Sequence, residues 1–530
     1  MPMTSNLSHP LPNPALHLAR RPLAVAVLAL LPLLASANQS LSDSGFGLTV
    51  GPVFNRTNLG SAAYNPANAL RLIGDDEKVR IGVLQFGARY EIGAVDDVQK
   101  LSDSIKADVD AARASNNADQ AVTLANKINS TYLPTLETGA RANVQGQASL
   151  LAPLLWRTER LPGVWSFNVN AQAQASGAFR GGDMGVLVKF SSADANINGS
   201  RISVPVAGLA SQLSTLQSAA SSSDPAAQSA ALQGLTGLLS TADQATLNQL
   251  ISATGSGSTV GTSYALTSAS AFDFKVAQVN QLSLGFATDL TDATRLQGLS
   301  PATRLDAGVR LSIYQARLYR QLAAFVDADG NSNTIELSSA RTYQSNASAL
   351  GVDLGLMWHD TNYQLGASLY NLNRPRLRYP SPLQDSNSAN RTAAQQLAAA
   401  GKISLDDAVE LKPHLVLEGS LFSADKRWLL QGSYAVNQTT DFVGDPHKRA
   451  TVSAGFNAER FDNGWLDYLV PSVRVGYQRD LVGSKLSTIG LGLSWGVFNI
   501  DLNSSTQKVQ ADGSNVPRAA GVAISIAEKF

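Results

Sequence analysis

The stretch of sequence that decides the fold is residues 489–497, which read IGLGLSWGV. Large apolar side chains occupy every second position, namely Ile489, Leu491, Leu493, Trp495 and Val497. Successive side chains of a β-strand point to opposite faces, so this segment predicts a strand with one apolar face and one face of glycine and serine. The same alternation recurs at 305–313, 350–359 and 472–478. The chain is therefore predicted to be an all-β protein built from many such strands.

Alternation of this kind occurs in secreted soluble β-proteins as well as in membrane barrels. Three features favour an antiparallel transmembrane barrel. The alternating segments are about 9–11 residues long, which is the length of a strand that crosses an outer membrane. Their polar faces carry glycines and isolated charges, as the wall of a lumen would. Aromatic residues gather at the predicted strand ends, where interfacial girdles form: Trp165, Trp358, Tyr363, Trp428 and Trp495.

The composition supports a membrane barrel and excludes several other classes of protein. Charged residues make up only 15% of the chain, against about 25% in a soluble globular protein. The 41 basic and 41 acidic residues balance, so no basic surface is expected that would bind nucleic acid. There is no cysteine, which rules out disulfides, Fe–S clusters and Cys-ligated zinc. No cofactor and no metal site are expected.

The N-terminus has the order of regions of a secretory signal peptide. Two arginines at positions 20 and 21 precede the apolar run at 23–34, and the small residues Ala35 and Ala37 follow it. We expect cleavage after Ala37, which would remove residues 1–37. A membrane anchor is the alternative, but the apolar run has only about 12 residues, against the roughly 20 of a spanning helix. The predicted location is the outer membrane of a Gram-negative bacterium.

The last strand resembles the one by which the assembly machinery recognises outer-membrane proteins. In GVAISIAEKF, the apolar side chains that share one face are Val522, Ile524, Ile526 and Phe530. Glu528 occupies a position on that face where an apolar residue is usual. A carboxylate near the membrane interface costs little, so this departure weakens the match without breaking it. Outer-membrane lipids and the barrel-assembly machinery are therefore expected partners.

Three stretches change from a period of two to helical spacing, at about 96–130, 204–252 and 388–411. In the second stretch, Asp224 and Pro225 have the residue types of an N-cap and a first helical position. The third is expected to include SLDDAVEL, which starts at Ser404. Helices rich in Ala and Leu need a partner surface, so we expect insertions that pack together outside the membrane or against the barrel mouth. A flexible Ala/Ser linker is the alternative.

One short pattern near the N-terminus is more specific than the others: LGSAAYNPANAL, which contains Asn65, Pro66 and Ala67. Small residues allow close packing, and the Asn-Pro pair forces a turn. The pattern precedes the first clear strand. We therefore expect residues 38–77 to form a hatch-like plug and residues 78–530 to form the barrel.

Isolated charged residues lie on the polar faces of otherwise apolar strands: Asp306, Arg310, Asp353, Glu418 and Arg474. In a barrel they would point into the lumen, because an arginine at the lipid midplane costs about 2–4 kcal/mol. Two roles remain open for them. They form either a static ion-pair network that stabilises the interior or a polar lining that selects a solute.

Several stretches resemble the exported TraF family of conjugal transfer proteins, within the wider FadL-type superfamily of long-chain fatty acid transporters. They are SAAYNPANAL, LYNLNRP at 369–375, and YLVPSVRVGYQRDL at 468–481 with the STIGLGLSWGVFNIDL that follows it. The resemblance implies a barrel of about 14 strands, within a range of about 12–16. It also implies an N-terminal segment in the lumen, with the NPA element as the hatch turn. Transport of hydrophobic solutes is implied only through the wider superfamily, because a fold does not determine a function.

Three functional hypotheses follow. The leading one is a passive channel or transporter for small hydrophobic molecules. The second is a non-transporting envelope component, such as an adhesive or scaffold barrel that binds envelope proteins during conjugation or secretion. The third is an outer-membrane hydrolase that would use His359 or His414. Because the chain has no HExxH or Walker motif, an enzyme is not expected.

Overall fold

The computed structural model describes residues 47–51, 59–74, 76–96, 98–158, 161–206, 210–294, 302–327, 330, 343–457, 471–511 and 513–528. The predicted cleavage residues Ala35 and Ala37, and the aromatic residue Phe530, lie outside these ranges, as does the side chain of Glu528.

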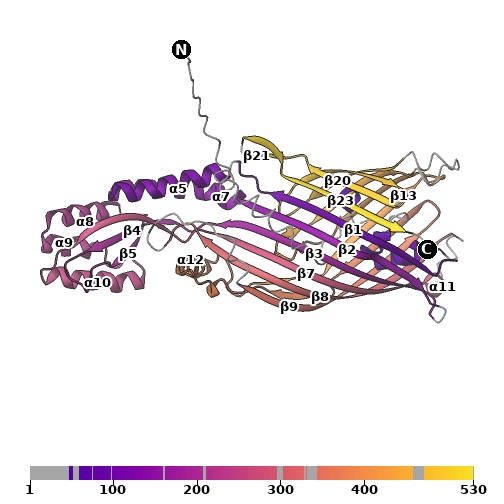
Figure 1. The fold of residues 1–530 in the computed structure, drawn as a ribbon, viewed down its shortest axis with the longest axis horizontal. Helices are drawn as coiled ribbons and strands as arrows, with labels where there is room; N and C mark the ends of the chain where they lie inside the picture. Colours follow the sequence, from indigo (N-terminus) through magenta and orange to yellow (C-terminus); the bar gives the residue numbers. More distant parts are fainter. Residues whose placement is uncertain are drawn as a thin grey trace, which may run out of the picture.

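The described chain is organised around a closed antiparallel β-barrel of fourteen strands (Figure 1), which confirms the predicted fold class. The last strand returns to the first, with Ile524 opposite Phe86, so the fourteen described strands leave no unpaired edge. In barrel order the strands are β1 (Val79–Ile92), β2 (Arg141–Arg157), β3 (Val164–Arg180), β7 (Ala271–Asp289), β8 (Arg304–Ala324), β9 (Gln344–His359), β10 (Tyr363–Tyr370), β13 (His414–Phe422), β14 (Trp428–Ala435), β17 (Arg449–Phe456), β18 (Ser472–Asp480), β19 (Ser487–Trp495), β20 (Phe498–Ser505) and β23 (Ala519–Glu528).

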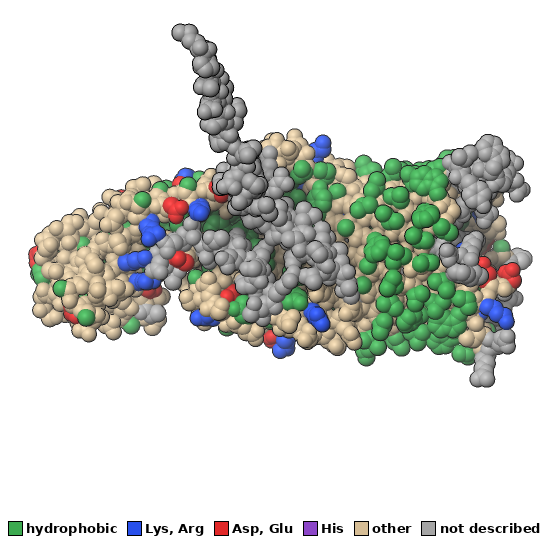
Figure 2. All heavy atoms as spheres, in the orientation of Figure 1, with side chains coloured by type: hydrophobic (Ala, Val, Ile, Leu, Met, Phe, Trp, Pro, Cys, Tyr) green, Lys and Arg blue, Asp and Glu red, His purple; other side chains and the backbone are tan. Residues whose placement is uncertain are grey.

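A belt of exposed apolar side chains surrounds the barrel, and Figure 2 shows it as a green band on the face in view. Its members are the outward residues that the alternation predicts, such as Leu491, which is 43% exposed, and Ile524, which is 47% exposed. A continuous apolar surface of this kind is stable against lipid and not against water. The barrel is therefore a transmembrane barrel.

The two ends of the barrel differ in their connections. At one end, here called the short-turn end, strands are joined by residues 360–362, 423–427 and 496–497. The other end, here called the long-loop end, carries the connections 93–140, 181–270 and 371–413. The predicted aromatic residues all lie near the short-turn end, namely Trp165, Trp358, Tyr363, Trp428 and Trp495.

Six neighbouring strands are longer than the predicted 9–11 residues: β1 has 14, β2 17, β3 17, β7 19, β8 21 and β9 16. The outward face of β8 explains the difference. It is apolar at Val309, Leu311 and Ile313 but polar at Gln315 and Arg317. Only the first part of β8 therefore contributes to the belt, and the rest extends beyond it at the long-loop end. The prediction of strand length was wrong for this wall because the alternation continues where the protein leaves the membrane.

A head domain, made of the helices and the small sheet at the far left of Figure 1, extends from these long strands. Its sheet has the order β5 (Arg201–Pro205), β4 (Met184–Ser191) and β6 (Gly261–Ser268). The sheet was not anticipated from the sequence. The helices of the head and its neck are α5 (Val98–Ser115), α6 (Ala118–Lys127), α7 (Leu133–Gly139), α8 (Ala210–Ser222), α9 (Pro225–Gln233) and α10 (Thr241–Gly255).

The head helices pack on the small sheet around a core of their own. Leu213, Leu232 and Leu250 are fully buried in it with Val186 and Val204 of the sheet. The Asp224 side chain accepts a hydrogen bond from the Ala226 N–H, and Pro225 is the first residue of α9, which confirms the predicted helix start. None of the helices in the described part of the chain is both long and apolar enough to span a bilayer.

The third predicted helical stretch is only partly helical. Helix α12 (Ser388–Ala399) ends before Gly401, whose φ of +70° leaves the helical region. Residues from Ser404 onward were predicted to be helical and are not. The Arg320 guanidinium donates to the Ser404 carbonyl, and Lys275 pairs with Asp407, so this stretch is held against the inside of the wall. It leads into β12 (Ala408–Glu410), which pairs with β11 (Arg376–Arg378).

Replacing Leu491 with arginine should destabilise the barrel by about 2–4 kcal/mol, because the new charge would lie in the lipid midplane. Urea unfolding of protein refolded in phospholipid vesicles measures the loss. Val497→Arg is the control, because Val497 lies in the turn after β19, where the expected cost is about 0–1 kcal/mol. Equal losses at the two positions would contradict the assignment of the belt.

Candidate functional site

The candidate functional site is the lumen, which the N-terminal segment enters. This segment comprises α3 (Gly47–Val50), the 3-10 helices η3 (Leu59–Ala63) and η4 (Pro66–Asn68), and α4 (Ala69–Leu72). Helix α3 packs against β17–β20 and β23, whereas η4 packs against β7, β8 and β9. The segment therefore contacts two different parts of the barrel wall. We call its described residues, 47–51 and 59–74, the hatch.

The NPA element forms a buried turn at the centre of the hatch. Asn65 Oδ1 accepts a hydrogen bond from the Ala67 N–H at 3.0 Å, and Pro66 begins η4. Asn65 Nδ2 donates to Glu418 Oε1 at 3.0 Å and to the Leu356 carbonyl at 3.1 Å. One asparagine thus caps its own turn with its oxygen and joins that turn to two strands with its nitrogen.

Two glycines of the wall make room for this turn. A Cβ on Gly355 would overlap Asn65 Oδ1 and lie 2.9 Å from Pro66 Cδ. A Cβ on Gly308 would overlap the Ala67 backbone nitrogen. Glycine on the lumen face of β8 and β9 is therefore a requirement of the hatch, because any side chain there would displace the turn.

A buried ion pair holds the residues just before the turn. Arg310 and Asp353 are 2.9 Å apart, with side chains 9% and 3% exposed. Arg310 also donates to the Ala63 carbonyl, and the Tyr370 hydroxyl donates to the Tyr64 carbonyl. Removing one partner of such a buried pair typically costs about 3–5 kcal/mol, so this contact strongly fixes the position of the hatch.

A second charged cluster holds the end of the hatch. Arg71 Nε donates to Asp306 Oδ2 at 2.6 Å, and its Nη2 contacts Asp306 Oδ1 and Asp289 Oδ2. His359 Nε2 lies 3.0 Å from Asp306 Oδ2. Asp306 is fully buried, and the guanidinium of Arg71 balances its charge.

The opposite end of the hatch is held mainly through backbone contacts. Gln478 Nε2 donates to the Gly47 carbonyl at 2.6 Å, and Asn503 Nδ2 donates to the Leu48 carbonyl at 3.3 Å. A Cβ on Gly476 would overlap the Thr49 carbonyl oxygen, and a Cβ on Gly490 would lie 2.6 Å from Thr49 Cα. Glycines on the lumen face therefore make room both for the NPA turn and for helix α3.

The structure places all five charges predicted from the sequence inside the barrel. Asp306, Arg310, Asp353 and Glu418 come together around the hatch. Arg474 lies elsewhere and pairs with Asp501 at 3.0 Å across Gly492. Asp501 was not predicted from the sequence, although it occupies the polar face of the alternating segment FNIDL.

The long-loop end has a second closure, formed by residues 371–413 and 436–448 folded against the inner wall. We call it the loop cap. Phe442 and Val443 of the cap are buried with Val279, Tyr314 and Leu318 of the wall. The Tyr379 hydroxyl, from the first of the two loops, donates to the Phe442 carbonyl at 2.8 Å. The lumen therefore contains protein near both of its ends.

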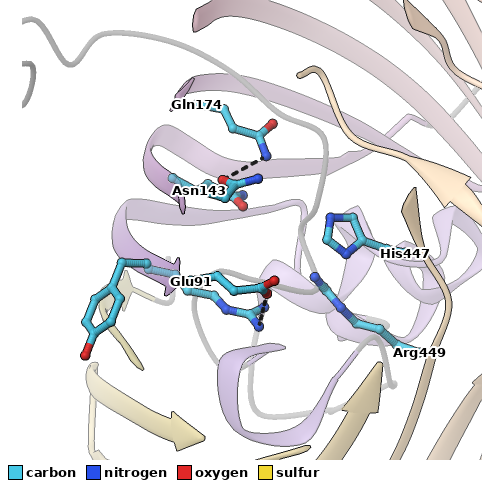
Figure 3. A pocket seen from close by; sticks show the side chains of 8 residues that line it. Glu91, Asn143, Gln174, His447 and Arg449 are labelled. Atoms are coloured by element: carbon cyan, nitrogen blue, oxygen red, sulfur yellow. Dashed lines mark hydrogen bonds and ion pairs between the residues drawn. The ribbon is translucent and has the colours of Figure 1, made fainter. Parts of the chain in front are cut away.

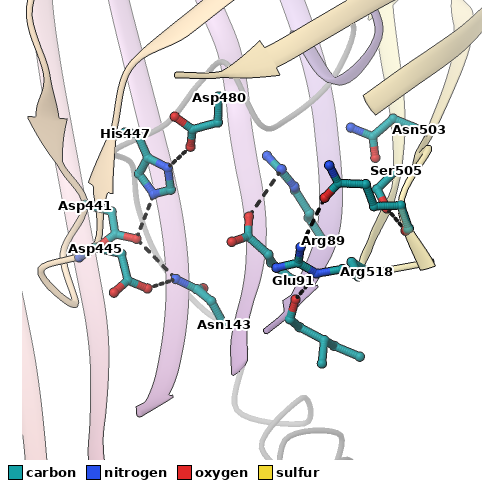
Figure 4. Close-up of polar contacts among 12 residues, drawn as sticks. Arg89, Glu91, Asn143, Asp441, Asp445, His447, Asp480, Asn503, Ser505 and Arg518 are labelled. Carbon is teal, nitrogen blue, oxygen red and sulfur yellow. Dashed lines mark hydrogen bonds and ion pairs between the residues drawn. The ribbon is translucent and has the colours of Figure 1, made fainter. Parts of the chain in front are cut away.

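A histidine between two carboxylates anchors the loop cap (Figure 4). His447 Nε2 lies 3.2 Å from Asp441 Oδ2, and its Nδ1 lies 2.9 Å from Asp480 Oδ2. Burial alone would lower the pKa of His447, but the two carboxylates raise it to about 10. Burial and the neighbouring charge of Asp441 raise the pKa of Asp445. His447 is therefore an imidazolium that separates two like charges.

A small pocket remains open beside the loop cap, and Figure 3 shows it from close by. Its volume is about 20 Å³, which is enough for a water molecule. Within it, Gln174 Nε2 donates to Asn143 Oδ1 at 3.4 Å, and Arg89 lies 3.7 Å from Glu91. The full lining is Arg89, Tyr90, Glu91, Asn143, Gln145, Gln174, His447 and Arg449.

The two histidines that the hydrolase hypothesis would use contact a carboxylate and a backbone carbonyl. His359 contacts Asp306, and His414 Nδ1 lies 3.1 Å from the Asn437 carbonyl, so neither contact is with a serine hydroxyl. The letters GLSWG at 492–496 match GxSxG, but Ser494 lies on a strand and accepts from Arg474, not on a strand-to-helix turn. Among the described residues, no group of three or more His, Asp or Glu could hold a metal ion.

Replacing Gly355 with valine should expel the NPA turn from its place on β9, because the new side chain would overlap Asn65. We expect the hatch to become sensitive to added protease while the barrel remains heat-modifiable on gels. Gly455→Ala is the matched control, since a Cβ on Gly455 of β17 would have no neighbouring atom closer than 3.7 Å. Protection of the hatch in Gly355→Val would contradict this account.

Replacing His447 with glutamine should loosen the loop cap, because Asp441 and Asp480 would lose the cation between them. Chymotrypsin cleavage at Phe442 measures the loosening. Lys448→Gln removes the same charge from the next residue, whose ammonium lies over the Tyr434 ring, and should leave the cap protected. In the unchanged protein, the stabilisation by His447 is fully present below pH 6.5 and is lost as the pH rises through about 10. A cap that opens between pH 6.5 and 8 would contradict the assignment.

Comparisons with known proteins place the chain in a family. A TodX deltaS2S3 mutant monoaromatic hydrocarbon channel is 12% identical, with a TM-score of 0.40, and the match covers 94% of this chain and 100% of that one. A Pseudomonas aeruginosa FadL homologue is 10% identical, with a TM-score of 0.35 and coverage of 94% and 99%. No curated protein matches the chain. The model of the family described as "F plasmid transfer operon, TraF, protein" matches residues 62–434, and the chain belongs to this family.

Proposed function

We propose that the protein is an outer-membrane channel that is closed at rest by the hatch and the loop cap. The observation that carries this proposal is that the hatch is hydrogen-bonded to two separate parts of the wall, at Glu418 and at Gln478. A segment held in this way blocks a lumen without being part of the barrel. Opening then requires the hatch to leave one of its two attachments.

The orientation follows from the connections between strands. Outer-membrane barrels have short periplasmic turns and longer extracellular loops. We therefore place the short-turn end in the periplasm and the head outside the cell. Outer-membrane lipids would cover the belt, and the barrel-assembly machinery would insert the protein.

The family resemblance implies that the solute is hydrophobic, and this stays a prediction. The inner faces of β2 and β3 are lined by amides and hydroxyls, including Gln147, Ser149 and Asn170, each at most 5% exposed. A hydrophobic solute could form no hydrogen bond with such groups, whereas a polar solute could. We propose that the lumen admits small polar solutes.

Single-channel recording in planar bilayers tests the proposed function. The unchanged protein should show rare openings, and Gly355→Val should conduct continuously, because its hatch is displaced. Gly455→Ala should behave like the unchanged protein. Equal, negligible conductance of all three proteins would overturn the proposal that this barrel is a channel.

A second candidate function is a scaffold for conjugation or secretion partners. The head favours it, because this domain has its own core and extends beyond the membrane belt. Replacing residues 206–260 with a short linker would remove α8–α10 but keep the strands on either side. Under this hypothesis, the replacement lowers conjugal transfer or secretion by the host. When it is combined with Gly355→Val, the conductance of the barrel stays as it is in Gly355→Val alone. A host defect that appears only in variants with altered conductance would count against the scaffold hypothesis.

A further inference from the structure

One wall of the lumen carries a row of paired polar side chains. The register of β2 and β3 places Gln145 opposite Gln174, Gln147 opposite Gln172, and Ser149 opposite Asn170. On β7, Gln281 lies opposite Asn170, and Ser283 lies opposite Asn168. Because alternate residues of a strand are about 6.6 Å apart, these pairs form a ladder along the lumen. We call this set of residues the amide track.

Several amides of the track are buried but have hydrogen-bonding atoms with no partner among the residues that the structure describes. Gln145 Nε2, both polar atoms of Gln147, Asn170 Nδ2 and Gln281 Oε1 are in this state, in residues that are at most 8% exposed. Asn168 Oδ1 joins them. Buried polar groups are normally paired, either with other protein groups or with ordered water. These unpaired atoms of the track are therefore available to form hydrogen bonds with water or with a solute.

The chemistry of the track selects a class of solute. Each amide presents an N–H donor beside a C=O acceptor, and a hydroxyl group can satisfy both. No charged residue lies among the track residues. At the long-loop end of the track, Arg89 is paired with Glu91. An ionic solute would therefore find no counter-ion within the track, and an apolar solute would leave the amides unpaired.

The ends of the track lie at the two closures. At the long-loop end, Gln145 and Gln174 of the track also line the small pocket beside the loop cap. Gln174 Nε2 donates to Asp441 of the loop cap as well. Toward the short-turn end, η3 of the hatch packs against β2. The track therefore connects the place where a solute would enter with the plug that it would have to pass.

We propose that the amide track binds uncharged, polyhydroxylated solutes, such as short oligosaccharides, on their way through the lumen. This inference rests on the proposed channel function and names the class of solute. It differs from the resemblance, which implies hydrophobic solutes.

Binding is tested separately from conduction, with maltotriose as the probe and isothermal titration calorimetry on the purified protein. The unchanged protein and Gly355→Val are both titrated. We expect saturable binding in at least Gly355→Val, and we expect Gln147→Leu and Asn170→Leu on that background to weaken it roughly tenfold each. Toluene and triglycine, as apolar and peptide probes, should bind more weakly than maltotriose.

A matched control comes from another wall of the lumen. Gln431 on β14 is a buried amide, 3% exposed, whose two polar atoms have no partner in the described part of the chain, but it is not part of the track. Gln431→Leu should bind maltotriose as the parent does. Absence of maltotriose binding in both parents, an equal loss in Gln431→Leu, or preferential binding of toluene or triglycine would each overturn the proposal. Failure of the channel proposal can be distinguished from failure of the binding proposal. It appears as absent conductance, whether or not maltotriose binds.

Discussion

The structure depends on one constraint, which is that a chain within lipid must pair all its backbone N–H and C=O groups internally. Fourteen antiparallel strands meet this constraint by closing on themselves, with β23 hydrogen-bonded to β1. Closure assigns every second side chain to lipid and the others to an enclosed space. The apolar belt and the polar lumen therefore have the same origin, and the content of the lumen becomes the central question for function.

The lumen is occupied by specific contacts between the hatch and the wall. Gly308 and Gly355 allow the NPA turn to lie directly on β8 and β9, and Asn65 then reaches Glu418 on β13. The Arg310–Asp353 pair lies beside the turn and bonds to its backbone. A static ion-pair network and a functional lining were the two alternatives for these charges. The contacts favour a third role, in which the charges fasten the hatch to the wall.

The two closures differ in how they are held. The hatch depends on close backbone approach at glycines and on buried ion pairs. The loop cap depends on an apolar core around Phe442 and on the imidazolium of His447 between Asp441 and Asp480. Between them, the amide track offers hydrogen-bonding groups that nothing in the described chain satisfies. These features are the basis on which we propose regulated passage of polar solutes.

The amino-acid sequence by itself determined the barrel, its outward apolar residues and the inward placement of Asp306, Arg310, Asp353, Glu418 and Arg474, because alternation with a period of two is a local property of each strand. It also located the NPA turn and the start of α9 at Pro225. It did not reveal that β2, β3 and β7–β9 continue beyond the membrane, or that residues from Ser404 leave the helix, because both depend on what packs against them. Only the tertiary structure decided which charges meet. Asp501, Asp441 and Asp480 find their partners through strand register and loop folding, and the amide track exists only because β2, β3 and β7 align in one register.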